Sequence, residues 1–358
     1  MKKFGFGLVV LLVVVAVARQ CPAVDYSPEY TSINGRDFGY YVPESYDPST
    51  PTQLLFMFHG AGGNISEASG GSAENGYYGW QTSAHQNGFI VLFPQGVGWL
   101  NLWSLSSNGN SSDLPFVDDM IDWATTNYNI STSQIFTTGH SWGAYFSYYV
   151  ARWRSDDIAA FAEHSGGISS IPVPSLASGP SPKLNGILLH AVDDGIVDYS
   201  GSQNLYDALL ANGHNVYNDG IGDDGIIEVD GWGPDNHRYR LEHNQTQWDF
   251  FLSVAPTPVD GDFNGDGNVT TADYDIMRAN FFSTGNAFNV NGEVTGPGGV
   301  LDGVVDIYDF KHFSENLFPG GASAFASAMA GAVPEPNTFV LLLAAAPACL
   351  LRRSRNRK

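Results

Sequence analysis

Cysteine is nearly absent from this chain, and positive charge is scarce. Only Cys21 and Cys349 occur among the 358 residues, each near one end, so the count predicts no disulfide framework. The chain has 16 Lys and Arg against 37 Asp and Glu, and its formal net charge is −21 at pH 7. Nucleic-acid backbones are bound through Lys and Arg. The composition therefore argues against a nucleic-acid-binding protein.

The N-terminal hydrophobic run is too short to be a typical membrane span. Leu8–Val17 follows Met1-Lys2-Lys3, whereas a spanning helix needs about 20 apolar residues. The small-residue pattern Ala16-Val17-Ala18 is typical of a cleavage site. These features predict a secretory signal peptide over residues 1–18, with a membrane anchor as the alternative.

A second short apolar run lies at the C-terminal end. Pro334-Glu335-Pro336 precedes the apolar stretch Phe339–Leu351, and the basic cluster Arg352–Lys358 follows it. This tail, residues 333–358, resembles the bacterial PEP-CTERM sorting signal. The resemblance implies transient membrane contact, then cleavage near the motif and secretion or surface attachment. An ordinary C-terminal anchor is the alternative, and both place the rest of the chain outside the cytoplasm.

Between these ends, strand-like apolar runs alternate with helical segments over residues 25–254. Leu54–Phe58 and Phe89–Pro94 are continuous apolar runs, as expected of strands buried on both faces. The alternation predicts an α/β domain with a mostly parallel sheet. Further strands are predicted at Arg36–Val42, Gln134–Thr138, Ala159–His164 and Gly186–His190, and helices at Phe116–Tyr128, Ala144–Trp153 and Glu242–Ser253.

A G-x-S-x-G motif, residues 139–143, stands between a predicted strand and a predicted helix. This context is typical of a nucleophile elbow, in which a strained turn holds the serine hydroxyl clear of the sheet. Side chains at Gly139 and Gly143 would clash with neighbouring backbone. Ser141 is therefore the candidate nucleophile, and the amide of Trp142 at the helix start is a candidate oxyanion donor.

A second Gly-rich loop follows the strand Leu54–Phe58. Its sequence is His59-Gly60-Ala61-Gly62-Gly63. Glycines let backbone amides approach a substrate oxygen, so we expect Ala61 or Gly62 to supply the second oxyanion N–H. A simple Gly-rich turn is the alternative.

The partners of the serine are expected downstream in the order acid, then base. Asp194 follows the strand Gly186–His190 and is the candidate acid, with Asp193 and Asp198 as contenders. Among the later histidines, His237 lies in a Gly/Pro-rich loop before the final helix, from which a side chain can reach the serine. The other two are His214, expected at the surface, and His243, expected inside that helix. His164 is expected to have a structural role, and Trp99 and Trp103 are candidates for the lining of a substrate cleft.

These motifs together resemble one group of secreted α/β-hydrolases. Residues 54–252 look like the esterases of the feruloyl esterase, acetyl xylan esterase and polyhydroxybutyrate depolymerase group, although Ala191 stands where the family often has Gly. The resemblance implies hydrolysis of a carboxylic ester, with no metal in the reaction, on an acylated polysaccharide or a polyester. A serine peptidase on the same fold, or a non-catalytic surface interaction protein, are the alternatives.

A calcium-loop pattern follows a short Pro-rich linker, residues 255–259. Oxygen side chains recur from Asp262 to Asp273, and Gly267 stands at the sharp turn. Calcium takes about six to eight oxygen ligands, which this spacing can supply. The pattern resembles a type I dockerin repeat, so a module over 260–318 with structural Ca²⁺ is expected, and a cohesin-type protein partner is implied. The predicted ligands of this loop are Asp262, Asn264, Asp266, Asn268, Thr270 and Asp273.

A second, altered copy of the loop follows. Asp302, Asp306 and Asp309 repeat its latter half, and Asn289–Gly292 is the candidate for its first half, with Glu293–Leu301 inserted. Because Asp is missing from its first positions, we expect weaker calcium binding there. Residues 319–332 are expected to be a linker before the sorting tail.

Overall fold

The computed structural model describes residues 25–48, 50–70, 77–168, 181–218, 225–229, 236–256, 259–263, 267–284, 292–297, 299 and 302–330. The predicted signal peptide and sorting tail lie outside these residues. None of the helices within these ranges is long and apolar enough to cross a membrane.

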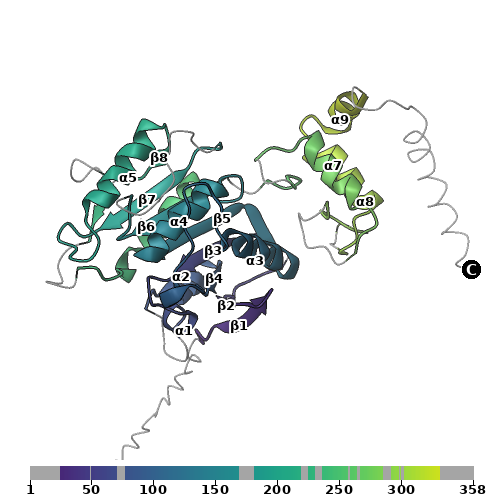
Figure 1. Cartoon of the computed structure of the whole chain (residues 1–358). Helices are drawn as coiled ribbons and strands as arrows, with labels where there is room; N and C mark the ends of the chain where they lie inside the picture. The colour runs from purple at the N-terminus through teal and green to yellow at the C-terminus, as the bar shows by residue number, and fades with distance from the viewer. Residues whose placement is uncertain are drawn as a thin grey trace, which may run out of the picture.

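A mixed, mostly parallel sheet forms the centre of the large domain (Figure 1). Its strand order is β1-β2-β4-β3-β5-β6-β7-β8, with β9 also paired to β7. The β1–β2 and β2–β4 pairs are antiparallel, and the pairs from β4 to β9 are parallel. The strands are β1 (Glu29–Ile33), β2 (Arg36–Tyr41), β3 (Thr52–Phe58), β4 (Ile90–Pro94), β5 (Ile130–His140), β6 (Ala160–His164), β7 (Asn185–His190), β8 (Asn215–Val216) and β9 (Ile227–Glu228).

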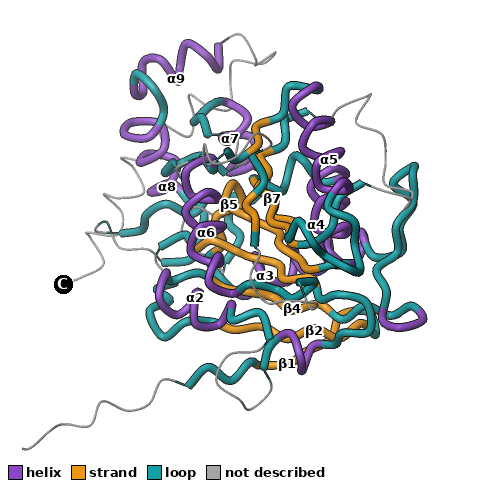
Figure 2. The backbone as a smooth tube through the Cα atoms, turned by 90° about the vertical axis from the view of Figure 1, so that its left-hand side faces the viewer, coloured by secondary structure: helices purple, strands orange, loops and turns teal. Residues whose placement is uncertain are grey.

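Helices cover both faces of this sheet, and each face has its own hydrophobic core. Along β3, Phe56 and Phe58 belong to one core, while Leu55 and Met57 belong to the other. Successive strand side chains point to opposite faces, so a continuous apolar run serves both cores. The helices of the first face are α3 (Leu114–Asn127), α4 (Trp142–Trp153) and α5 (Ser200–Ala211), and those of the second are α1 (Ile65–Ala68), α2 (Trp80–Asn87) and α6 (Asn244–Val254) (Figure 2).

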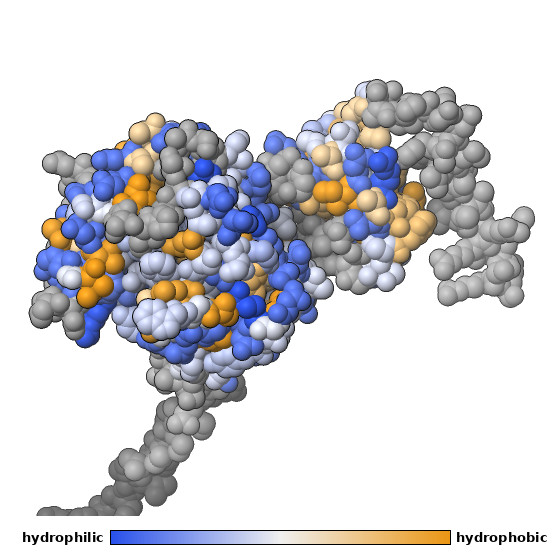
Figure 3. Space-filling view, viewed as in Figure 1, coloured by the Kyte–Doolittle hydropathy of each residue, from blue (hydrophilic) through white to orange (hydrophobic). Residues whose placement is uncertain are grey.

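The carboxyl ends of the parallel strands carry the loops that contain the predicted site residues. The His-Gly loop follows β3, Ser141 follows β5, and the loop with Asp194 follows β7. Because these ends meet at one edge of a parallel sheet, residues far apart in sequence come together there. Polar residues dominate the visible outer face of the domain, with hydrophobic side chains in scattered patches (Figure 3).

The C-terminal residues form a small helical unit with a separate core. Its helices are α7 (Thr271–Ala279), α8 (Ile307–His312), η5 (Phe313–Leu317) and α9 (Gly321–Ala330). Phe325 of α9 is buried in this core beside Tyr274 and Phe313. The expectation of a linker over residues 319–332 is therefore wrong for α9, because a buried aromatic side chain ties that helix to the module.

Candidate functional site

The turn after β5 holds Ser141 in a strained backbone conformation. Ser141 has φ 55° and ψ −120°, and α4 begins at the next residue. A Cβ on Gly139 would lie 2.1 Å from the carbonyl oxygen of Gly143, and one on Gly143 would lie 2.1 Å from that of Phe58. Both approaches are impossible for a real side chain. The two glycines therefore allow the tight strand–turn–helix junction that presents the Ser141 hydroxyl.

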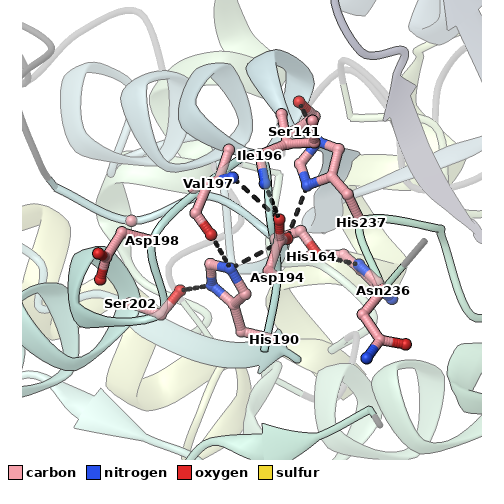
Figure 4. Close-up of polar contacts among 12 residues, drawn as sticks. Ser141, His164, His190, Asp194, Ile196, Val197, Asp198, Ser202, Asn236 and His237 are labelled. Carbon is pink, nitrogen blue, oxygen red and sulfur yellow. Dashed lines mark hydrogen bonds and ion pairs between the residues drawn. The ribbon is translucent and has the colours of Figure 1, made fainter. Parts of the chain in front are cut away.

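Three side chains from separate loops form a continuous hydrogen-bonded line at this turn. The Nε2 atom of His237 lies 2.8 Å from the Oγ atom of Ser141, and its Nδ1 atom lies 2.6 Å from Oδ2 of Asp194 (Figure 4). An imidazole so placed can accept a proton from the hydroxyl while its other nitrogen donates to the carboxylate. The structure thus brings together the three residues that the sequence singles out.

Asp194 is held as a carboxylate by several donors. Its side chain is fully buried, and Oδ1 accepts hydrogen bonds from the amides of Ile196 (2.8 Å) and Val197 (2.9 Å). Burial works to raise the pKa of Asp194, but hydrogen bonds from His190, His237 and the two amides outweigh it and lower the pKa well below its usual value. Asp194 therefore stays ionised beside His237.

The other candidate acids point elsewhere. Asp193 accepts a hydrogen bond from the side chain of Asn236. Asp198 accepts from the amide (2.9 Å) and the hydroxyl (2.5 Å) of Ser200, at the start of α5. These contacts give both residues local roles and leave Asp194 as the acid partner of His237.

The side chains of the three other histidines considered, His214, His243 and His164, make no hydrogen bond with the Ser141 hydroxyl in the described part of the chain. His214 accepts a hydrogen bond from the Leu184 amide (3.1 Å). It is buried, so the expectation that it lies at the surface is wrong. His243 lies in the short helix η4 (Leu241–His243), just before α6 and not within it. His164 is fully buried between the Ser165 hydroxyl (3.1 Å) and the Arg240 amide (3.0 Å), in agreement with the expected structural role.

His140, which precedes Ser141, contacts the backbone of His237. Its Nε2 atom lies 2.8 Å from the carbonyl oxygen of His237, to which it donates. Burial, and then the charge of His237, lower the pKa of His140 to about 3, so its ring is neutral. In the sequence this residue is only the variable position of the motif, and the available signal was a polar ring beside the candidate nucleophile.

The backbone amides near Ser141 narrow the choice of oxyanion donors. The Trp142 amide is the first of α4 and has no carbonyl partner within the helix. The Gly62 amide already donates to the carbonyl oxygen of Leu100 (2.7 Å), whereas the Ala61 amide has no hydrogen-bond partner among the described residues. Of the two alternatives, Ala61 is therefore the better candidate, and Gly62 instead anchors the turn η1 (Trp99–Asn101).

The two tryptophans near this loop differ in exposure. Trp103 is buried, and its indole donates to the carbonyl oxygen of His59 (2.9 Å), so it belongs to the core rather than to a cleft wall. Trp99 is 82% exposed on η1. The side chain of Asn101 also fastens η1 to Gly63 (2.8 Å). Of the two tryptophans, Trp99 is thus the one that remains a candidate for the lining of a substrate cleft.

The first calcium-like loop is only partly described. Asn264 and Asp266 lie outside the described residues. Asp273 accepts hydrogen bonds from the amides of Phe263 (2.8 Å) and Thr270 (2.7 Å), and Asp262 accepts one from Gly267 (2.7 Å). Asn268 is exposed. Within the described ranges no three His, Cys, Asp or Glu side chains converge as a metal centre.

The second loop repeats these contacts with a different first residue. Asp309 accepts from the amides of Val294 (2.8 Å) and Asp306 (2.8 Å), as Asp273 does from Phe263 and Thr270. Val294 thus matches Phe263, so Glu293 takes the place of Asp262, and the insertion falls between Glu293 and Asp302. The loop was expected to begin within Asn289–Gly292, and this expectation is wrong because Glu293 takes its first position. Asn289–Asn291 lie outside the described residues.

Glu293 is a buried acid whose carboxylate has no hydrogen bond of normal geometry among the described residues. Its side chain is completely buried, and the amides of Asp302 and Gly303 face it. Burial, followed by the charges of Asp309 and Asp302, raises the pKa of Glu293 to about 7. A buried carboxylate of this kind is the type of group that a hard cation such as Ca²⁺ binds.

Comparisons with known proteins show the same kind of fold and point to esterases. No family model matches the chain. Feruloyl esterase C of Emericella nidulans is 29% identical over 182 residues, which cover 50% of this chain and 63% of that protein. A bifunctional acetylxylan esterase/xylanase of Neocallimastix patriciarum is 26% identical over 269 residues, 69% of this chain and 37% of that protein. The chain thus spans less than two thirds of the length of these relatives.

A solved structure gives the fold. A thermostable esterase superposes with a TM-score of 0.50 at 20% sequence identity, over 64% of this chain and 62% of that one. Together with the mostly parallel sheet and its helices on both faces, this match defines an α/β-hydrolase-like fold for the large domain.

Proposed function

We propose that this chain is a secreted carboxylic ester hydrolase that acts through Ser141, His237 and Asp194. The observation that carries the proposal is the unbroken line of short contacts from the serine hydroxyl through the imidazole to the buried carboxylate. The esterase relatives support an ester as the substrate, and the acetylxylan esterase/xylanase among them favours acylated polysaccharide, with a polyester as the remaining choice.

The mechanism follows from these roles. His237 takes the proton of the Ser141 hydroxyl as the oxygen attacks the ester carbonyl, and Asp194 stabilises the imidazolium that forms. The amides of Trp142 and Ala61 donate to the oxyanion of the tetrahedral intermediate. His237 then protonates the leaving alcohol, and water hydrolyses the acyl-enzyme with the same imidazole as base.

A serine peptidase and a non-catalytic binding protein are the competing proposals. An activated serine can attack esters and amides alike, so the hydrogen bonds among Ser141, His237 and Asp194 do not distinguish an esterase from a peptidase. Fold alone does not define a substrate either. The relatives named above favour the ester. The strained, glycine-dependent turn at Ser141 favours catalysis over mere binding, because strain at such a turn is retained where function needs it.

A substrate panel with an active-site probe tests the proposal. We expect a fluorophosphonate to label the full chain, and methyl ferulate or acetylated xylan to be hydrolysed well above peptide amides. Hydroxybutyrate oligomers examine the polyester alternative in the same assay. A chain that is not labelled is not a serine hydrolase, and one that prefers the amides is a peptidase.

The ends and the second module complete the proposal. We infer that residues 1–18 direct secretion and that residues 333–358 act as a bacterial sorting signal, so that the mature protein is extracellular or bound to the cell surface. The C-terminal module is proposed to be dockerin-like, with structural Ca²⁺ and a cohesin-type protein as its partner. The repeated hydrogen-bond pattern at Asp273 and Asp309 supports two related loops.

Calcium binding by the second loop depends, in this proposal, on Glu293. We expect calorimetry on the full chain to find calcium bound at both loops, and Glu293→Gln to weaken one of the two by about tenfold or more, because a carboxylate ligand is lost. Asp262→Asn should weaken the other. Glu315→Gln is the matched control, since this exposed acid is paired with Lys311 (4.0 Å) and is not among the predicted ligands. Equal binding by wild type and Glu293→Gln contradicts the assignment of Glu293.

A further inference from the structure

The carboxylate of Asp194 is shared by two histidines. Besides His237, the ring of His190 approaches it, with Nε2 lying 3.3 Å from Oδ2 of Asp194. The same nitrogen is 3.1 Å from the carbonyl oxygen of Val197. His190 ends β7 and its side chain is completely buried. Dashed lines in Figure 4 join its ring to Asp194, Val197 and Ser202. A ring nitrogen that faces two acceptors must carry a proton, so Nε2 of His190 is an N–H donor.

The opposite nitrogen of His190 faces a buried hydroxyl. Its Nδ1 atom lies 2.7 Å from Oγ of Ser202, which is fully buried in the first turn of α5. In a neutral ring protonated at Nε2, Nδ1 accepts, so Ser202 donates its hydroxyl proton to His190. With two acceptors at Nε2 and the Ser202 hydroxyl as donor at Nδ1, His190 carries its proton on Nε2.

The alternative is a charged His190 with Ser202 turned toward Glu163. The Ser202 oxygen is 3.5 Å from Oε2 of Glu163, much longer than its contact with His190. Burial raises the pKa of Glu163 to about 8, so that carboxyl is neutral at pH 7 and is a weaker acceptor for the Ser202 proton than a carboxylate would be. Both observations favour Ser202 as the donor to Nδ1 of His190.

We propose that His190, held in one tautomer by Ser202, is a positioning residue that fixes the carboxylate of Asp194 for His237. Oδ1 of Asp194 is held by two backbone amides, and Oδ2 receives N–H groups from both rings. Rotation of the carboxylate would break bonds on both oxygens, so the acid is preorganised before substrate binds. This inference rests on the proposed esterase function.

Ser202→Ala tests the tautomer lock, with Ser200→Ala as its matched control. Ser200 lies on the same helix, but it is exposed and bonds only Asp198 in the described contacts. We expect Ser202→Ala to lower kcat by about 10-fold to 100-fold with little change in KM, because a small misplacement near the reacting groups has such an effect. Ser200→Ala should match the wild type.

Two substitutions of His190 separate positioning from packing. His190→Asn removes the donor to Asp194, whereas the longer side chain of His190→Gln can place an amide N–H near the lost Nε2–H. We expect the asparagine variant to lose activity, and its kcat/KM profile to shift its acid limb to higher pH, since an Asp194 with one donor fewer favours the imidazolium form of His237. The glutamine variant should recover part of the rate and of the profile.

Three results would overturn the inference while the proposed function stood. These are a Ser202→Ala variant as active as Ser200→Ala, equal losses in both His190 variants with unshifted pH profiles, and ring ¹⁵N spectra of the wild type showing His190 charged or protonated at Nδ1. Failure of the wild type to hydrolyse any ester would instead refute the proposed function. The spectra still report the tautomer of His190 in that case.

Discussion

Replacing Ser141 by alanine should abolish ester hydrolysis and leave the fold intact. The substitution removes only the hydroxyl oxygen that lies 2.8 Å from His237. Alanine has the same Cβ as serine, so it adds no new clash at φ 55°. Loss of the nucleophile in a serine hydrolase lowers kcat by about 10⁵-fold to 10⁶-fold. Initial rates on a p-nitrophenyl ester, together with thermal unfolding followed by circular dichroism, measure both parts of this expectation.

The same variant should lose its reaction with a fluorophosphonate, because that reagent labels only an activated serine. Ser200→Ala, at an exposed position, should keep both hydrolysis and labelling. A Ser141→Ala variant that hydrolyses the ester at the native rate would mean that another group is the nucleophile. Loss of activity with an unchanged melting temperature excludes unfolding as the cause.

The serine turn was predictable because its constraints are local. A strand, a tight turn and a helix follow one another in sequence, and the two glycines sit where any Cβ would meet backbone at 2.1 Å. Buried strands such as β3 were equally readable, since a run of apolar residues serves two cores at once. Their predicted bounds differ from the observed ones by only a few residues at either end.

Contacts between distant parts of the chain were not readable from the sequence. Chain order favoured Asp194 and His237, but the choice of Asp194 over Asp193 depends on which way adjacent side chains point in one loop. The hydrogen bond from His140 joins residues 97 positions apart. No periodicity or local motif encodes such a contact, so the contacts of His140 and His190 were found only in the structure.

The second module shows the same limit. The Gly/Ala/Ser-rich composition of α9 is typical of a linker, and the helix is kept by burial of Phe325 among other aromatic rings. Glu293 looked like part of an insertion because spacing alone cannot show which residue takes the first position of a loop. Matching the amides that bond Asp273 and Asp309 identifies it.

Replacing Asp194 by asparagine should lower kcat by about 10⁴-fold, the effect of the same change in a serine protease triad. If Oδ1 of the asparagine keeps the amides of Ile196 and Val197, its NH₂ group faces His237. His237 then accepts at Nδ1 and carries its proton on Nε2, where it cannot take the proton of Ser141. The NH₂ group also meets the N–H of His190, so we expect a loss of stability as well.

The loss of stability in Asp194→Asn should depend on pH, and the pKa of Asp194 gives the direction of that dependence. The folded-state pKa of Asp194 is lowered from 3.8, so its ionised form stabilises the fold above that pH and the contribution is lost as the pH falls further. The difference in melting temperature between wild type and Asp194→Asn should therefore be largest near neutral pH and shrink in acid. Asp198→Asn, at an exposed acid bonded to Ser200, is the control and should stay near wild-type activity. An Asp194→Asn variant within tenfold of the wild-type rate would contradict the role of Asp194, because a base in the wrong tautomer cannot sustain turnover.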